Sequence, residues 1–437
     1  MDRTIKWGSA LAALAVVVAA CQGAASPTPG PTATGTATAP PATATPAPTP
    51  TPGYPTGEIN LTMWTKEGDP NINYVKTLAA NYSLAHPNVS IEVVNKDVEA
   101  LREDFQTASL AGNAPEILWT VSDHIGPFTT ADIIRPVDDL IDPSVYLDVA
   151  LANMVAGGQT WGVPISYGNQ LMLYWNKTLV PEAPADFDAL VAKAKELTDS
   201  AAGKYGLVYN QTEPFWTAPF LGGFGGAVFA ADGVTPTLDT PEMKATLEFL
   251  YNLKFTDKIV PSEADYAVSD SLFKDGSAAM IVNGDWALAD YVTALGDNLG
   301  LGPIPQIPAT GKYPAPYTAG TFFMIPKDLS GDELTVVADF MNWSTMKEQQ
   351  VEMVKELKRL PANLEALSDP IVTGDTYLAG AAEAVKVGTP MPTNIEMRCV
   401  WDSWKPAITK MYGGDSGIDA LLTEMQSSAE SCIAAQG

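Results

Sequence analysis

The sequence predicts an α/β protein with two lobes, and its length, composition and apolar spacing support this prediction. The chain has 437 residues, of which 46% are hydrophobic and 17% are charged. At roughly 150 residues per domain, this length suits two or three domains with real cores. Segments of alternating apolar residues come between segments of helical apolar spacing, which is typical of a partly parallel sheet with helices on its faces.

The first 57 residues predict export and attachment to a membrane. Two basic residues precede an apolar run over 10–20 that is too short to span a bilayer, so we assign 1–20 to a lipoprotein signal peptide. Small residues stand before Cys21, as in the bacterial lipobox; a plain secretory signal with an incidental cysteine is the alternative. Residues 21–57 are rich in Pro, Thr and Ala and predict a disordered tether. We therefore expect anchoring to the outer face of the cell membrane by a lipid on Cys21.

The folded part begins with a predicted β-α-β unit. Residues 59–63 alternate apolar with polar side chains, residues 74–82 carry apolar residues at helical spacing, and residues 89–93 alternate again. A helix over 99–111 and a short strand over 116–119 are expected to follow.

The rest of the chain becomes increasingly helical. Helices are predicted to begin near Phe187 and Met243, and a strand is predicted over 278–282. After Pro326 the predicted elements are mostly helices, over 332–345, 346–358, 376–387, 395–411 and 417–434.

The last two predicted helices form a hairpin that brings two cysteines together. Cys399 lies sixteen residues before Asp415 in the turn, and Cys432 lies seventeen after it. Positions equidistant from the turn of such a hairpin lie side by side. Because an exported protein meets oxidising conditions, we predict a Cys399–Cys432 disulfide, with two free buried thiols as the alternative.

Composition and local motifs exclude several kinds of chemistry. Lys and Arg number 25 against 51 Asp and Glu, a formal net charge of −26, which argues against nucleic acid as a partner. Two histidines and three cysteines are too few for a His/Cys metal cluster, and we expect no metal and no cofactor. The run 413–417 resembles a protease nucleophile motif but lacks a nearby His base, and the glycine-rich run 222–226 lacks the Lys-Ser/Thr of a phosphate loop. We interpret them as a helix–helix turn and a flexible loop.

Aromatic residues beside carboxylates or amides point to a ligand. A pyranose ring has an apolar face that stacks on aromatic rings, and its hydroxyls donate to carboxylates. Any one pair is most simply core packing beside a solvated acid, whereas five such pairs at predicted loop positions indicate a site for a neutral sugar. The pairs are Trp64 with Glu67 and Asp69, Trp119 with Asp123, Phe215 and Trp216 with Glu213, Trp286 with Asp285, and Trp401 with Asp402.

Several strings spread over 58–437 carry a family resemblance. They include Leu61-Thr62-Met63-Trp64, Gly162-Val163-Pro164-Ile165, Glu213-Pro214-Phe215-Trp216-Thr217 and Asn283-Gly284-Asp285-Trp286. With these strings the chain resembles the extracellular solute-binding proteins of ATP-binding-cassette (ABC) sugar importers, and within them the maltose/maltodextrin-binding proteins. The Glu-Pro-aromatic-aromatic-Thr string is the one most specific to maltodextrin binders.

The resemblance implies a two-lobed periplasmic-binding-protein-like fold with discontinuous domains, joined by hinge crossovers and closing around sugar. Mapped onto this chain, lobe 1 covers 58–168 and 321–368, and lobe 2 covers 169–320 and 369–437. The implied function is capture of maltose or malto-oligosaccharides by a monomer that delivers them to the membrane permease of an importer. The implied protein is a binder and not an enzyme.

The resemblance also implies roles for single residues: stacking aromatics, hydroxyl-accepting carboxylates, and a loop after the first strand that supplies an acid and a lysine. Asn169 or Gln170 lies where the family carries a carboxylate at the crossover. His124 and Lys405 replace family arginines and Leu288 replaces a tryptophan, which could alter the sugar accepted. The full predicted ligand-binding set is Trp64, Lys66, Glu67, Asp69, Asp123, His124, Asn169, Glu213, Phe215, Trp216, Tyr266, Trp286, Trp401 and Lys405.

Two other classes share some of these features. A glycoside hydrolase also places acids beside aromatic residues, and Glu213 would be its best acid, but no motif places a second one. A cell-surface adhesion module for insoluble polysaccharide would use the same tether, although it would present a flat aromatic face.

Overall fold

The computed structural model describes residues 53–436. The predicted signal peptide, Cys21 and nearly all of the predicted tether lie outside these residues. Within the described part, no helix combines the length and the apolar composition needed to cross a bilayer.

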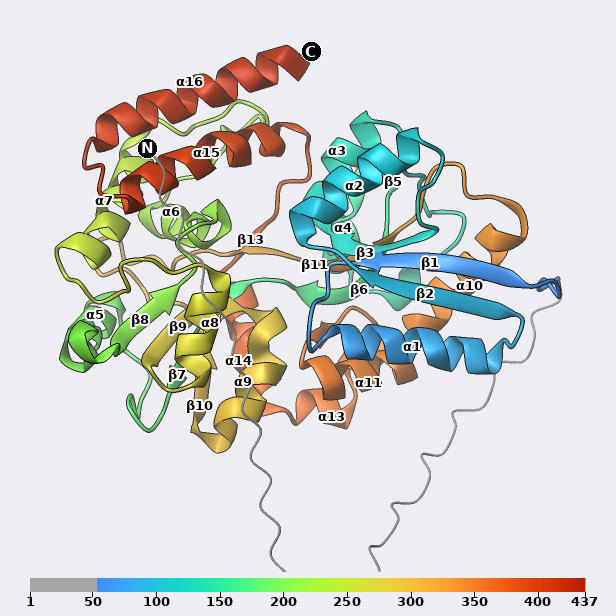
Figure 1. Cartoon of the computed structure of the whole chain (residues 1–437), viewed down its shortest axis with the longest axis horizontal. Coiled ribbons are helices and arrows are strands. Elements are labelled where there is room, and N and C mark those ends of the chain that lie inside the picture. The colour runs from blue at the N-terminus through green and yellow to red at the C-terminus, as the bar shows by residue number, and fades with distance from the viewer. Residues whose placement is uncertain (1–52, 437) are drawn as a thin grey trace, which may run out of the picture. The chain divides into compact units, whose positions relative to one another are not determined.

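The first sheet has seven strands and is of mixed direction (Figure 1). Its strands follow the order β12-β6-β11-β3-β1-β2, and β13 pairs with β11. The β1, β2 and β3 strands are parallel, as the β-α-β pattern predicts, whereas β11 runs antiparallel to β3 and β6. The strands are β1 (Ile59–Thr65), β2 (Val89–Asn95), β3 (Ile117–Val121), β6 (Val163–Gly168), β11 (Tyr317–Met324), β12 (Leu360–Pro361) and β13 (Thr389–Pro390).

Helices connect and cover the strands of this first sheet. Its core is a separate apolar cluster built on β1, β3, β6 and β11. The helices associated with this part of the chain are α1 (Ile72–Ala85), α2 (Val98–Leu110), α3 (Ile125–Thr130), α4 (Asp148–Ala152), α10 (Gly331–Ser344), α11 (Lys347–Leu357), α12 (Leu364–Leu367) and α13 (Pro370–Thr373). A small hairpin of β4 (Val155–Ala156) and β5 (Gln159–Thr160) precedes β6.

The second sheet has four strands in the order β10-β7-β9-β8. Only β8 and β9 are parallel. The strands are β7 (Leu171–Asn176), β8 (Tyr205–Tyr209), β9 (Ala278–Gly284) and β10 (Leu299–Gly302). The helices of this part are α5 (Phe187–Leu197), α6 (Ala218–Phe224), α7 (Pro241–Phe255), α8 (Tyr266–Lys274), α9 (Leu288–Leu295), α14 (Thr376–Lys386), α15 (Glu396–Tyr412) and α16 (Ile418–Gln436).

A two-residue crossover leads from the first sheet to the second. β6 ends at Gly168, β7 begins at Leu171, and Asn169 adopts a positive φ of 53° between them. Gly168 has a φ of +127°, and a Cβ atom there would lie 2.5 Å from the Gln170 side-chain oxygen. Only glycine therefore fits this position without strain.

The C-terminal helices lie within one or two residues of the predicted bounds. The α15 and α16 helices form the expected hairpin, and a disulfide joins Cys399 to Cys432 with their Cα atoms 5.6 Å apart. Amphipathic spacing located these helices well because each buries one apolar face against its neighbours.

Two sequence interpretations are wrong in ways that packing explains. Trp119 lies fully buried in the middle of β3, with its ring 5.3 Å from that of Phe323, so it belongs to the core and not to a loop. The glycine run 222–226 is not a flexible loop, because α6 includes Gly222 and Gly223. A Cβ atom on Gly222 would lie 2.7 Å from the Ala315 side chain, so this run allows close packing of a helix.

Candidate functional site

Four predicted aromatic residues gather beside the second sheet. The Trp286 ring centroid lies 5.9 Å from that of Trp216 and 6.1 Å from that of Phe215, and the Trp286 indole donates to the Tyr266 hydroxyl over 3.2 Å. Trp216 is buried and donates to the Val282 carbonyl, whereas the other three rings keep exposed surface. This aromatic cluster can stack on an apolar ring face.

Short turns after strands position these rings. Phe215 and Trp216 lie on the 3-10 turn Pro214–Trp216, which follows β8, and Trp286 lies on the turn Asp285–Ala287 directly after β9. Tyr266 opens α8, where the Asp265 carboxylate caps the helix by accepting from the Val268 amide. The carboxyl ends of neighbouring parallel strands lie at one edge of a sheet, so both turns come together there.

Residues of the loop after β1, a strand of the first sheet, reach the aromatic cluster. The Asn71 amide donates to the Trp286 carbonyl over 3.0 Å, and the Lys66 ammonium lies 6.0 Å from the centre of the Trp286 ring. The side of the aromatic cluster at Trp286 is therefore in contact with the loop after β1.

Glu67 has a structural role in place of the predicted ligand contact. Both of its carboxylate oxygens accept from the Arg359 guanidinium over 2.7 Å, and Lys66 lies 3.0 Å away. Glu67 and Arg359 are 2% and 1% exposed. Burial alone would raise the pKa of Glu67, but the charges of Arg359 and Lys66 outweigh it and hold this pKa well below its usual range. The carboxylate is thus buried, and both of its oxygens accept from Arg359.

The crossover is tied to the turn that carries Trp286. The Asn169 backbone N–H donates to the Asp285 carboxylate over 3.0 Å, and the Asp285 backbone N–H donates to the Gln170 backbone carbonyl over 3.1 Å. Burial raises the pKa of Asp285, and the Arg359 charge opposes this shift. Asp285 therefore holds the crossover in place through these hydrogen bonds, which differs from its predicted role as a hydroxyl acceptor beside Trp286.

Two other predicted residues remain apart from the aromatic cluster. One face of the Trp64 ring is occupied by the Lys96 ammonium, 4.2 Å from the ring centre. Asp69 is exposed and lies in the loop between β1 and α1. Among residues 53–436, no hydrogen bond or ring contact connects either residue to the aromatic cluster.

A second group of predicted residues lines a small pocket formed by α2, the turn after β3, α3 and α15. Asp123 and His124 lie on the turn after β3, and Trp401 lies on α15. Trp401 stacks on Trp404 with ring centroids 6.0 Å apart. Burial, followed by the charge of Glu99, raises the pKa of Asp123 to about 6. The lining residues are Glu99, Arg102, Asp123, His124, Pro127, Met397, Arg398 and Trp401.

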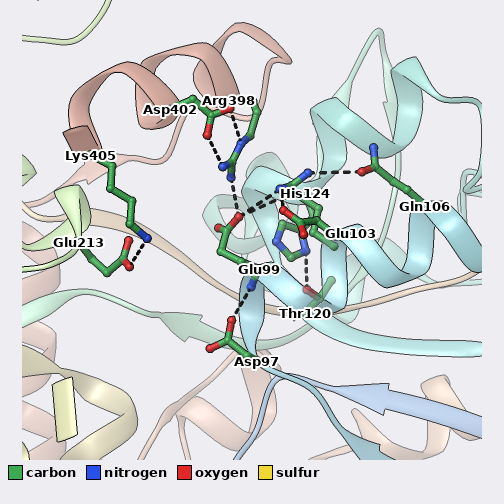
Figure 2. A network of polar contacts seen from close by, with 11 residues as sticks. Asp97, Glu99, Glu103, Gln106, Thr120, His124, Glu213, Arg398, Asp402 and Lys405 are labelled. Carbon is green, nitrogen blue, oxygen red and sulfur yellow. Dashed lines mark hydrogen bonds and ion pairs between the residues drawn. The ribbon is translucent and has the colours of Figure 1, made fainter. Parts of the chain in front are cut away.

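His124 offers an uncharged ring nitrogen where the resemblance expects an arginine. The side chain is buried, and its Nδ1 lies 2.8 Å from the Thr120 hydroxyl (Figure 2). Burial and then the charges of Arg102 and Arg398 lower its pKa to about 3, so the ring is neutral at pH 7. Its Nε2 has no hydrogen-bond partner among the described residues. A buried nitrogen of this kind suits a ligand hydroxyl.

Glu213 and Lys405 link the two groups of residues. The Lys405 ammonium donates to the Glu213 carboxylate over 2.6 Å (Figure 2). Phe215 follows Glu213 by two positions, and Trp401 precedes Lys405 by one helical turn. This ion pair therefore joins the segment that leads to Phe215 of the aromatic cluster to the helix that carries Trp401 of the pocket.

The structure adds site residues that the sequence reasoning missed. Glu99 and Arg398 form an ion pair of 2.5 Å in the pocket wall, and Tyr317 lies edge-on to Trp401 at 6.0 Å. Arg398 could have been found, because it lies three positions before Trp401 and thus on the same helix face. Glu99 gives no such signal, since its partner comes from a distant part of the chain. No cluster of three metal-ligating side chains occurs among the described residues.

Comparison with known proteins decides the family. A model of the bacterial extracellular solute-binding proteins matches residues 77–380, which is more than half of the chain. The chain belongs to this family. The family resemblance and the two-lobed fold inferred from the sequence are thus confirmed, and the protein is a binding protein and not an enzyme.

Individual relatives agree with this assignment. The chain is 26% identical to the maltotriose-binding protein of Pyrococcus abyssi over 378 residues, covering 85% of this chain and 82% of that protein. It is 25% identical to a maltooligosaccharide ABC transporter solute-binding lipoprotein of Streptococcus pneumoniae over 370 residues, covering 82% and 84%. The structure of the maltose/maltodextrin-binding domain MalE from Bdellovibrio bacteriovorus bound to maltotriose matches this solute-binding protein with a TM-score of 0.82 and 32% identity, covering 86% and 100%.

Removing the buried cation tests the structural role of Glu67. We expect Arg359→Met to lower the free energy of unfolding by about 3–5 kcal/mol, because it leaves a buried carboxylate paired only with Lys66. The folded-state pKa of Glu67 is below its unfolded value, so the pair stabilises fully above about pH 4.5 and its contribution is lost in acid. Denaturant titrations at pH 7 and pH 3 measure both effects.

Arg135→Met provides the matched control for this variant. Arg135 pairs with Asp139 at 2.9 Å, but Asp139 is exposed, so the loss is expected to stay below about 1 kcal/mol. Equal effects of the two substitutions would contradict the assigned role of the buried pair.

Proposed function

We propose that this solute-binding protein captures maltose or malto-oligosaccharides between its lobes and delivers them to the membrane permease of an ABC importer. The observation that carries the proposal is the ion pair between Glu213 and Lys405, which connects the aromatic cluster with the helix that brings Trp401 to the pocket of Asp123. The printed names of the Pyrococcus, Streptococcus and Bdellovibrio relatives support this class of sugar. Transfer to a permease is supported by the name of the Streptococcus relative, which is an ABC transporter component.

The chemistry of binding follows from the side chains. The faces of Phe215, Trp286 and Trp401 stack on the apolar faces of successive glucose rings. Asp123 and Glu213 accept from sugar hydroxyls, and a hydrogen bond to a charged acceptor is worth roughly 1.5–3 kcal/mol. The His124 Nε2 adds a neutral contact in the pocket. A ligand touching both lobes favours the arrangement in which they approach each other.

A screen of sugars tests the proposal. A ligand that binds only the folded state must raise the melting temperature, so we expect a rise with maltose, maltotriose or maltotetraose and no sugar breakdown. Trehalose, cellobiose, xylobiose and glucose are the comparison sugars, and a galacto-oligosaccharide is added because one relative, 22% identical, is named for that ligand. A rise only with a sugar outside the malto-series would overturn the proposed substrate class.

Calorimetry on variants then locates the site. We expect Trp286→Ala to weaken maltotriose binding by about 2 kcal/mol or more, roughly thirtyfold. Tyr313→Ala is the control, because Tyr313 is also an exposed aromatic and takes no part in the aromatic cluster. The two variants should keep similar melting temperatures without sugar.

The raised pKa of Asp123 predicts a pH dependence of binding. With a pKa of about 6, Asp123 is mostly ionised at pH 7 and mostly protonated at pH 5. If the carboxylate is the hydroxyl acceptor, affinity falls by up to about tenfold between these pH values. His124, with a pKa of about 3, does not titrate in this range. We expect Asp123→Asn to bind more weakly at pH 7 and to lose the pH dependence; an unchanged profile would reject Asp123 as the acceptor.

We also propose that a lipid on Cys21 holds the protein at the outer face of the cell membrane. Small residues before Cys21 support this, as does the word lipoprotein in the names of the pneumococcal relatives. Fractionation of cells that express the Cys21→Ala chain tests it. The variant should leave the membrane fraction, and its retention there would exclude the lipid anchor.

A further inference from the structure

The ion pair between Glu99 and Arg398 joins lobe 1 to lobe 2 in the wall of the pocket. Lys347–Asp369 and Lys358–Asp375 also join the two predicted lobes, but none of these four residues lines the pocket. Glu99 lies in the first turn of α2, and Arg398 lies in the first turn of α15. The Arg398 guanidinium donates to the Glu99 carboxylate over 2.5 Å. Any movement that separates α2 from α15 must break this contact.

Each partner is held in place by a residue of its own helix (Figure 2). Arg102 lies 3.3 Å from the Glu99 carboxylate, and Asp402 accepts from the Arg398 Nε over 3.0 Å. Asp97 caps α2 by accepting from the Glu99 amide over 3.0 Å. Because both side chains are already oriented, forming the pair costs less side-chain entropy than it does for two free surface residues.

We propose that Glu99 and Arg398 form an interlobe latch that slows the release of bound sugar. The pair lies in the wall of the pocket that also holds Asp123 and Trp401, so it is positioned to keep the lobes together over the ligand. The sugar part of this inference rests on the proposed function, whereas the latch itself does not.

The latch differs from the other polar contacts near the site. Glu213 and Lys405 both belong to lobe 2, so separation of the lobes does not break their ion pair. The contact from Asn71 to the Trp286 carbonyl does cross between lobes, but it involves no charge. Glu99 and Arg398 are 45% and 25% exposed, so salt screens their attraction. Salt dependence therefore distinguishes the latch from the uncharged contact.

Amide hydrogen exchange of the full chain without sugar tests the latch directly. The decisive signal lies in the opposite lobe: Arg398→Gln should speed exchange in the first turns of α2, and Glu99→Gln should speed it in the first turns of α15. The double variant should exchange no faster than the single variants, because each removes the same contact. Gln is used because a charge swap would place new like charges beside Arg102 and Asp402.

Lys410→Gln is the matched control. Lys410 lies on the same helix as Arg398 and forms an ion pair of 2.6 Å with Glu424 of α16, within one lobe. It should leave exchange in α2 unchanged. If Arg398→Gln and Glu99→Gln alter exchange only on their own helices, the latch is overturned.

Stopped-flow release of maltotriose supplies the second readout. We expect Arg398→Gln to release the sugar about twofold to fivefold faster than wild type, and raising the salt from about 0.05 M to about 0.5 M should speed release from wild type but not from the variant. Unchanged release despite altered exchange would overturn the role in sugar retention. If wild type binds no malto-oligosaccharide, the proposed function fails while the exchange experiment still decides the latch.

Discussion

The buried contact between Glu67 and Arg359 is the interaction on which the arrangement of the site depends. It joins the loop after β1 to the segment that enters β12, and neither side chain is accessible to solvent. Lys66 also pairs with the Glu67 carboxylate, and its ammonium lies 6.0 Å from the centre of the Trp286 ring. The charge of Arg359 acts on Asp285, whose carboxylate accepts from the Asn169 backbone N–H at the crossover. A single buried charge cluster thus connects the first sheet, the crossover and the turn that carries a stacking ring. Such a cluster adds little net stability by itself, but each member becomes costly to remove.

Most of the fold was predictable because the elements are amphipathic and locally encoded. The helices near the C-terminus start and end close to the predicted residues, since apolar spacing and caps act over a few positions. The candidate binding residues were found where an acid or aromatic residue follows a strand, as at Asp123 and Trp286. That rule works because strand ends of one sheet open at a common edge.

The errors have a common physical origin in contacts between distant segments. Sequence alone placed Trp119 and Glu67 near a ligand. β-Sheet packing buries Trp119, however, and Glu67 forms a buried ion pair with Arg359, which lies 292 positions away in sequence. The glycine run near residue 222 looked mobile because its partner, Ala315, lies far along the chain. Glu99 could not be recognised for the same reason. A family resemblance predicts which residue type occupies a matched position. It does not predict the neighbouring side chains, which determine whether a charged group is available to a ligand.

The hairpin of α15 and α16 has a consequence for how such a protein can change its ligand. Arg398, Trp401 and Lys405 all come from about two turns of α15, and the disulfide at Cys399 fixes these turns to the next helix. Substitutions on the exposed face of this short segment leave the sheets, the crossover and the buried charge cluster untouched. Under the proposed function, the residues that define the architecture are therefore different from those that contact the sugar, and new specificities can arise during evolution with little risk to folding.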